Sequence, residues 1–326
     1  MLKEVLHYLA PVNLRTYVDC TLGAGGHASE LAKAHQELST LVGIDLDPTA
    51  HRIAQARLQA VLKDRPALQM HFLRGNYCDM KSLLATVPGT ALAGRIDAIL
   101  MDLGVSSMQL DTADRGFSFL RDGPLDMRMD PAAGMSAEEL LNTWSEAELG
   151  RIIRDYGEEK LWRLVARRIV QAREVEPIRT TQQLAAVIGQ TQLRSKGKKP
   201  AKGKGVHPAT RTFQALRIVV NNELVKLEKA IPDAIAALAP GGRLAIISFH
   251  SLEDRIVKYA FLRSAGKPTP EEEHLTYGPD KFAFLDQLEE NATAKIVTRK
   301  PVEGQDDEVS LNPRARSAKL RVLEKL

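Results

Sequence analysis

Glycines concentrate in one stretch between an apolar run and a helical pattern, and this stretch constrains the fold more than any other. Residues 17–27 read YVDCTLGAGGH, so a short apolar run ends on Asp19 and three glycines follow, Gly23, Gly25 and Gly26. Glycine tolerates positive φ and lets a ligand approach the backbone, and a helix that opens directly afterwards offers free N–H groups. The pattern predicts strand, tight turn and helix. Taken alone, it also fits an ordinary glycine-rich turn.

In the first third of the chain, apolar runs alternate with helical patterns. Strands are predicted at residues 40–44, 68–73 and 96–101, and a helix is predicted between the first two, at residues 48–62. The run at 96–101 is nearly all apolar, as expected for a strand buried on both faces of a parallel sheet. Strands that alternate with helices indicate an α/β fold with a doubly wound sheet.

An acid or a tyrosine follows each of these strands. Asp19 ends the first strand, Asp45 the second and Asp102 the fourth, and Tyr77 follows the third. Ligands of doubly wound sheets bind at the carboxyl ends of the strands, so we expect these residues to converge on one site. Asp45 lies about 20 residues after the glycines, where an acid can accept hydrogen bonds from ribose hydroxyls. The alternative is a helix N-cap or a loop acid, since Asp47 and Pro48 begin the next helix.

The alternation stops near residue 110 and resumes near residue 213. The part in between has four helical patterns, at Ala137–Leu149, Ile152–Tyr156, Leu161–Ala172 and Thr181–Thr191. The resumed part has a helix at Phe213–Leu238 and a strand at Arg243–Ser248. Two tail strands, Ala294–Lys300 and Ala318–Leu323, are expected to form an antiparallel pair at the sheet edge. Ser136, with two glutamates behind it, suits a helix start. We predict a discontinuous α/β domain, residues 1–110 and 214–326, with a helical insertion at residues 111–213.

Composition and charge indicate the cellular compartment of the protein more than its function. The 326 residues carry 45 basic and 41 acidic side chains, a net charge of +4, so any nucleic-acid signal has to be local. Cys20 and Cys78 make neither a disulfide framework nor a metal-binding spacing, and no metal is expected. There is no signal-peptide pattern and no apolar run long enough for a bilayer, which predicts a cytoplasmic protein without membrane association.

One local run of charge stands out. Residues 194–204, RSKGKKPAKGK, hold six basic side chains and no acid, with glycine and proline interruptions. A run of this composition cannot bury a core. Contact with a phosphate backbone and a solvated loop are both consistent with it.

Two nucleotide-like cofactors are compatible with the glycine stretch. The spacing Gly23-x-Gly25-x-x-Ala28 satisfies the dinucleotide fingerprint, which would indicate an NAD oxidoreductase. Asp19 argues against this, because its carboxylate would repel a pyrophosphate and attract a cationic or zwitterionic ligand. S-adenosylmethionine fits better. Its methionine part would lie near residues 19–27, its ribose on Asp45, its adenine near Tyr77 and its sulfonium toward Asp102.

Long motifs make the chain recognisable beyond this pattern. They are DCTLGAGGH at 19–27, MDLGVSSMQLD at 101–111, RGFSF at 115–119, GPLDMRMD at 123–130, HPATRTFQALRIVVNNEL at 207–224, PGGRLAIISFHSLEDRIVK at 240–258 and NPRARSAKLRV at 312–322. Over nearly its whole length the chain resembles the bacterial 16S ribosomal RNA cytosine-N4 methyltransferase family (the MraW type). The resemblance implies a class I S-adenosylmethionine-dependent methyltransferase whose substrate is a cytidine in the decoding region of 16S rRNA, within the small ribosomal subunit.

The resemblance also assigns residues to the cofactor. Carried over onto this chain, the family's cofactor contacts fall on Gly25, Gly26, His27, Asp45, Tyr77, Asp102 and Gln109. The motif is weakest around position 77, and the basic run at 194–205 is longer and richer in lysine than the family leads one to expect. The helical insertion would recognise the RNA. The oligomeric state stays open, with a homodimer among the alternatives.

Methyl transfer to the amine of cytosine needs help, because the lone pair of that amine is delocalised into the ring. Many amino methyltransferases place a (D/N)PP(Y/F) motif at the end of the fourth strand, where this chain has DLGVSS at 102–107. Asp102 is therefore the candidate catalytic residue; it either orients the amine or, as we slightly favour, turns toward the cofactor. The candidates for RNA contact are Ser106, Ser107, His207 and Arg211. The remaining alternative is a protein that binds RNA without methylating it.

Overall fold

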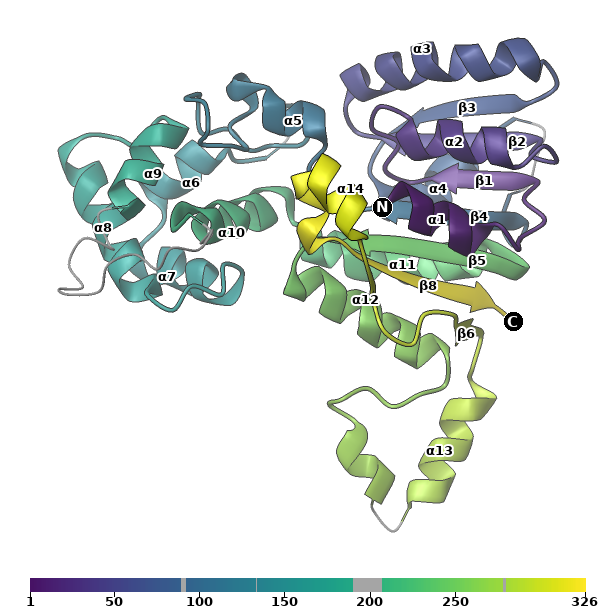
Figure 1. The fold of residues 1–326 in the computed structure, drawn as a ribbon. Coiled ribbons are helices and arrows are strands. Elements are labelled where there is room, and N and C mark those ends of the chain that lie inside the picture. The colour runs from purple at the N-terminus through teal and green to yellow at the C-terminus, as the bar shows by residue number, and fades with distance from the viewer. Residues whose placement is uncertain (89–91, 133, 190–206, 278–279) are drawn as a thin grey trace. The chain divides into compact units, whose positions relative to one another are not determined.

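The computed structural model describes residues 1–88, 92–132, 134–189, 207–277 and 280–326. The basic run at 194–204 lies outside these ranges. The chain divides into two compact units, one formed by Met1–Gly104 with Leu224–Leu326 and the other by Val105–Glu223 (Figure 1). Within the described ranges, every helix is too short or too polar to cross a bilayer.

A single mixed sheet forms the centre of the first unit. Its strands are β1 (Thr16–Asp19), β2 (Thr40–Asp45), β3 (Gln69–Arg74), β4 (Ile96–Asp102), β5 (Leu238–Ser248), β6 (Ala294–Ile296), β7 (Val302–Glu303) and β8 (Lys319–Lys325). The order is β3-β2-β1-β4-β5-β8-β6, with β7 also paired to β8. Strands β1 to β5 pair in parallel, whereas β8 runs antiparallel to its neighbours. The strand order reverses direction between β1 and β4, and crevices at such reversals bind ligands.

Helices cover both faces of this sheet. They are α1 (Leu2–Leu9), α2 (Gly26–Ala34), α3 (Pro48–Asp64), α4 (Met80–Leu84), α11 (Glu223–Ala237) and α12 (Ser251–Ser264). This unit also contains α13 (Lys281–Glu290), which projects away from the sheet (Figure 1), and α14 (Asp306–Leu311). Alternate strand residues point to opposite faces. Accordingly, Tyr17 packs in one core cluster with residues of α1, α2 and α3, and Val18 packs in another with residues of α4, α11 and α12. Burial on both faces explains the nearly continuous apolar strand at 96–101, and the predicted α/β sheet is confirmed.

The second unit is helical and has a core of its own. It contains α5 (Ser107–Asp111), α6 (Ala137–Thr143), α7 (Glu146–Asp155), α8 (Trp162–Val175), α9 (Thr181–Gly189) and α10 (Ala209–Asn221). Serines cap three of these helices. The hydroxyls of Ser106, Ser136 and Ser145 each accept a hydrogen bond from the backbone N–H three residues later. The Gln or Glu side chain at that later position accepts a hydrogen bond from the backbone N–H of the serine. These capping boxes fix where α5, α6 and α7 begin. The helix start expected at Ser136 is confirmed.

Two of the predicted helices are each split in the structure. The pattern at 137–149 is two helices, because Ser145 caps α7 and ends the continuity with α6. The pattern at 213–238 is also two, because Asn222 adopts a left-handed conformation (φ 52°) between α10 and α11. Asparagine is among the few residues other than glycine that adopt this conformation readily.

Two further expectations differ from the structure in their details. The tail strands β6 and β8 pair antiparallel, as expected, but β8 lies between β5 and β6 and is not an edge strand. The helical unit spans Val105–Glu223 where the sequence suggested 111–213. The wider bounds have a physical reason: the capping box at Ser106 opens α5, and Ala209 of α10 is buried in the helical core.

Candidate functional site

The conformation of the glycine turn after β1 is fixed by its close packing against α3. Gly25 has φ 70° and caps α2, and a Cβ added to it would lie 3.2 Å from the Cβ of Ala54. The next residue, Gly26, is the first residue of α2, and no side chain caps this helix. The N-terminus of α2 therefore keeps backbone N–H groups available for a ligand.

Asp19 is a buried carboxylate whose hydrogen bonds come from neutral groups. The hydroxyl of Tyr17 donates to its Oδ2 at 3.2 Å, and the N–H of Thr21 donates to its Oδ1 at 3.2 Å. Burial, with a smaller contribution from the nearby carboxylates of Asp102 and Asp45, raises the pKa of Asp19 to about 7 against the lowering effect of these hydrogen bonds. Within the described residues, no cationic side chain pairs with Asp19. A cationic group of a ligand would supply the missing partner.

Asp45 ties the end of β2 to the glycine turn. Its Oδ2 accepts the N–H of Gly23 at 2.8 Å, and its Oδ1 accepts the N–H of Asp47 at 2.8 Å. Burial raises the pKa of this carboxyl, while these two hydrogen bonds lower it. A carboxylate has about four lone-pair sites, so each oxygen can accept another hydrogen bond, for example from a ribose hydroxyl.

Asp102 and His27 face each other beside this turn without forming a hydrogen bond. The Nδ1 of His27 lies 3.7 Å from the Oδ2 of Asp102, which is too long for a hydrogen bond. Burial raises the pKa of Asp102 to about 7 and lowers the pKa of His27 to about 4. The imidazole is thus neutral at pH 7, and the two groups do not form an ion pair there.

Each member of this pair also keeps a polar atom unsatisfied. The Oδ1 of Asp102 and the Nε2 of His27 are buried without a hydrogen-bond partner. The Asp102 side chain as a whole retains 32% of its surface exposed, although its Oδ1 is buried. Unsatisfied buried polar atoms are costly, and at a strand end they are typical of a site that awaits a ligand.

The other two predicted cofactor residues lie in different settings. Tyr77 starts a short 3₁₀ turn (Tyr77–Asp79) and packs half-buried on the sheet's core, and the N–H of Gly75 before it donates to the carbonyl of Asp45. This bond brings the Tyr77 turn to the end of β2. Gln109 belongs to the helical unit, where its Oε1 accepts the N–H of Ser106 at 2.9 Å within a capping box.

One residue that joins these strand ends is missing from the sequence prediction. Thr21 donates its N–H to Asp19, and its Oγ1 accepts the N–H of Asp102 at 2.6 Å. The hydroxyl thereby links the first and fourth strands. Its position inside DCTLGAGGH is the only signal in the sequence, and that signal does not reveal which strand it would contact.

Comparison with known proteins decides the family. A family model described as the MraW methylase family matches residues 1–326. The chain belongs to this family. A protein of Heliobacterium modesticaldum named ribosomal RNA small subunit methyltransferase H is 44% identical over all of this chain and 97% of its own length. A protein of the same name from Geotalea uraniireducens is 46% identical, with the same coverage of the two chains.

Solved structures also match, with lower similarity. An rRNA methylase from Streptococcus thermophilus is 11% identical, with a TM-score of 0.38, over 99% of this chain and 95% of its own. Membership of the methylase family rests on the sequence comparisons and identifies the protein as a methyltransferase with a class I sheet. The alternative of an NAD oxidoreductase is thereby wrong.

The methyl donor of this methylase is S-adenosylmethionine, and the residues present fit it. Asp19 lacks a cationic partner and Asp102 has an unsatisfied oxygen, so the site attracts positive charge. S-adenosylmethionine carries a sulfonium and an α-ammonium, whereas the pyrophosphate of NAD would meet repulsion here. The absence of a side chain at Gly25 lets the glycine turn pack directly against Ala54 of α3, and this packing fixes the N-terminus of α2 beside Asp19 and Asp102.

Proposed function

We propose that the protein transfers a methyl group from S-adenosylmethionine to the exocyclic N4 of a cytidine in the decoding region of 16S rRNA, within the small ribosomal subunit. The observation that carries this proposal is the 44% identity, over the whole chain, to a relative named ribosomal RNA small subunit methyltransferase H. The acid-lined site at the strand ends supports the donor half of the reaction, and the motifs of the cytosine-N4 family support the acceptor half. An enzyme with this substrate would work in the cytoplasm.

The donor contacts follow from the polar groups at the strand ends. S-adenosylmethionine supplies an electrophilic methyl group on its sulfonium when it is bound. Asp19 and the N-terminus of α2, with Gly25, Gly26 and His27, would hold the amino-acid part, and Asp45 would accept hydrogen bonds from the ribose. Tyr77 would lie beside the adenine, and Gln109 is the contact proposed from the helical unit.

Asp102 is positioned for chemistry at the methyl group or the amine. It ends β4, next to the strand-order reversal, and its backbone N–H is held by Thr21. Its raised pKa makes it a better proton acceptor near pH 7 than an ordinary aspartate. In one role the carboxylate accepts a hydrogen bond from the cytosine amine, which localises the lone pair. In the other it contacts the donor and leaves the amine alone. The second role is the one we favour slightly.

The helical unit, Val105–Glu223, is our candidate for presenting the RNA. A target base has to leave its stack to reach an active site, and proteins read RNA mostly in unpaired regions. The ring of His207 is exposed and lies 4.7 Å from the ring of Phe119, which makes an aromatic surface suited to stacking. Arg211 instead lies 3.5 Å from Glu159, so part of its charge is already compensated.

The test is transfer of tritium from labelled S-adenosylmethionine to small subunits that lack the modification, followed by nucleoside analysis. We expect the label in N4-methylcytidine, and we expect subunits that already carry the modification to accept none. Label on carbon 5 of cytosine or on a ribose oxygen would overturn the amine assignment. Binding of RNA without any transfer would favour the binding-module alternative. Sedimentation of the same preparation would test the homodimer.

A further inference from the structure

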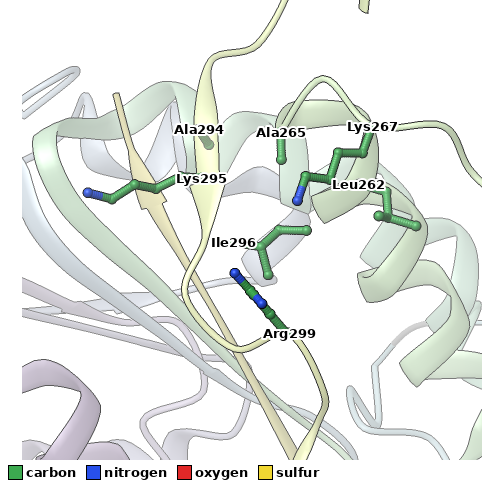
Figure 2. A pocket seen from close by; sticks show the side chains of 7 residues that line it. All are labelled: Leu262, Ala265, Lys267, Ala294, Lys295, Ile296 and Arg299. Carbon is green, nitrogen blue, oxygen red and sulfur yellow. The ribbon is translucent and has the colours of Figure 1, made fainter. Parts of the chain in front are cut away.

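The first unit has a pocket at the far edge of its sheet, beside β6. The pocket has a volume of about 310 Å³ and is lined by Leu262, Ala265, Lys267, Ala294, Lys295, Ile296 and Arg299 (Figure 2). The registers place it: Ile296 pairs with Leu323, which pairs with Leu244 near the start of the regular part of β5. The pocket is therefore at the opposite end of the sheet from Asp102, which pairs with Ile247. It is separate from the donor site.

The floor of this pocket is apolar and its rim is cationic. Lys267, Lys295 and Arg299 are exposed, and Ile296 is half-buried. Lys295 is already paired with Glu324 at 2.7 Å and extends away from the other two cations. Lys267 and Arg299 point toward Ile296 (Figure 2), and neither forms an ion pair with any acid among the described residues. Two uncompensated cations thus flank one apolar surface.

The backbone fixes where both cations start. α12 ends in a Schellman motif, in which the N–H of Lys267 donates to the carbonyl of Leu262 and the N–H of Gly266 donates to that of Arg263. Gly266 has φ 61°, and a Cβ there would lie 2.5 Å from the carbonyl oxygen of Leu288. Only glycine fits at this position, so the residue after it cannot be displaced easily.

On the other side of the pocket, Arg299 follows a residue that is tied to the sheet. The N–H of Thr298 donates to the carbonyl of Val322 at 3.2 Å, and the Oγ1 of Thr298 accepts the N–H of Val322 at 2.8 Å. Thr298 is buried, with 4% of its surface exposed. Arg299 thus extends from a rigid point, which lowers the entropy lost when its guanidinium binds an anion.

We propose that this pocket binds one unpaired nucleotide of the RNA substrate, with a phosphate between Lys267 and Arg299 and the base or ribose against Ile296. The inference rests on the proposed function, because a polyanionic substrate is what makes the charge complementary. The volume is at the lower end of the roughly 300–1,000 Å³ typical of ligand pockets, as suits a single nucleotide. Proteins that bind single-stranded nucleic acids combine cations along the backbone with stacking of the bases on aromatic rings. In this pocket the cations are present, and Ile296 would give the base an apolar contact in place of a ring.

The experiment compares a double charge reversal in the pocket, Lys267→Glu with Arg299→Glu, with a matched reversal outside it. The control is Lys63→Glu with Arg95→Glu, because both side chains are exposed and the change in net charge is equal. For each protein we would measure the affinity for small subunits and for a single-stranded RNA oligonucleotide over a series of salt concentrations, and the affinity for S-adenosylmethionine.

We expect the pocket variant to bind RNA about tenfold more weakly than the control, with a salt dependence reduced by about one phosphate contact. Affinity for S-adenosylmethionine and the melting temperature should match the control. Equal RNA binding by the two variants would overturn the pocket proposal. The proposed function would still stand as long as the wild-type protein transfers the methyl group to RNA. If the wild-type protein transfers no methyl group to RNA, the proposed function fails instead, whatever the variants do.

Discussion

The two ends of one sheet bind charge in opposite ways. At the carboxyl ends of β1 and β4, the buried carboxylate of Asp19 and the partly exposed carboxylate of Asp102 have no charged cationic partner among the described residues at pH 7. At the far edge, beside β6, exposed cations without an acidic partner surround an apolar floor. Burial makes the acidic end selective, because desolvated charge is costly until its partner arrives. Exposure lets the basic end bind anions without strict selectivity. This suits a contact to the phosphate backbone of RNA, which is the same for every nucleotide sequence.

The largest expected effect comes from Asp102→Asn, which would remove one charge from the acidic end. Methyl transfer should fall by about 100-fold or more, because the reacting groups lose their alignment, and the affinity for S-adenosylmethionine should fall with it. Isothermal titration and single-turnover kinetics separate the two. Asp64→Asn, at an exposed carboxylate of α3, is the control and should change neither.

The Asp102→Asn result also decides between the two roles of this carboxylate. Turnover lost with the donor affinity retained would assign Asp102 to the cytosine amine. A variant that keeps both turnover and affinity would show that donor binding does not depend on the carboxylate of Asp102. The proposed contrast between an acidic and a basic end of the sheet would then be wrong for β4.

Gly25→Ala tests the shape of the acidic end rather than its charge. The left-handed conformation costs a residue with a Cβ about 1–2 kcal/mol, and here the Cβ would also crowd Ala54. We expect lower stability and an affinity for S-adenosylmethionine reduced by about tenfold or more. Gly94→Ala is the matched control: its φ is also 70°, but the Cβ would meet nothing within 4 Å. It should lose stability through strain alone and bind the donor normally. Equal affinity of the two variants would show that donor binding does not depend on how the Gly25 turn packs against α3.

The acidic end should also respond to pH. The carboxyls of Asp19 and Asp102 have a pKa of about 7, so both become protonated as the pH falls from 8 to 6. Affinity for S-adenosylmethionine should fall over this range, by about tenfold for each carboxylate that the donor needs ionised. The effect on stability has the opposite sign: these carboxyls stabilise the free protein below about pH 4, and that contribution is lost as the pH rises through 7.

S-adenosylhomocysteine, which lacks the sulfonium charge, sharpens this pH test. If a carboxylate faces the sulfonium, S-adenosylhomocysteine should show a shallower pH dependence than S-adenosylmethionine in equilibrium dialysis. A flat profile for both ligands would mean that neither carboxylate contacts the donor.

The smallest effect is expected for Tyr77→Leu. Loss of a ring beside the adenine should weaken donor binding by a few fold, since aromatic contacts contribute about 0.5–1.5 kcal/mol beyond area. Tyr277→Leu, with 80% of the native side chain exposed, is the control. An unchanged KM for S-adenosylmethionine would place the adenine elsewhere.

Sequence patterns predicted what depends on local chemistry. The apolar run at 96–101 and the alternation around it were enough for the parallel sheet, and Ser136 was enough for a helix start. The break at Asn222 lacks the glycine or proline that would have marked it. The interior place of β8 depends on pairing with strands distant in sequence, which no local pattern contains. The candidate site followed the same rule, because strand-end acids were visible in the sequence and Thr21, which bridges two strands, was not.

The basic pocket escaped prediction for a related reason. Lys267 and Arg299 come from the end of a helix and from a loop after β6, and each alone is an ordinary surface cation. Only the folded chain brings them to the same apolar surface. The predicted cofactor role of Gln109 remains a prediction, since the capping box accounts for its amide without reference to a ligand.

The antiparallel placement of β8 has a consequence for how this protein is made. Ser248 of β5 and Lys319 of β8 are paired across 71 residues of sequence. During synthesis, β5 would therefore leave the ribosome with one bare edge and keep it until those later residues emerge. An open strand edge can pair with another chain, so a nascent copy is exposed to misassembly during this interval.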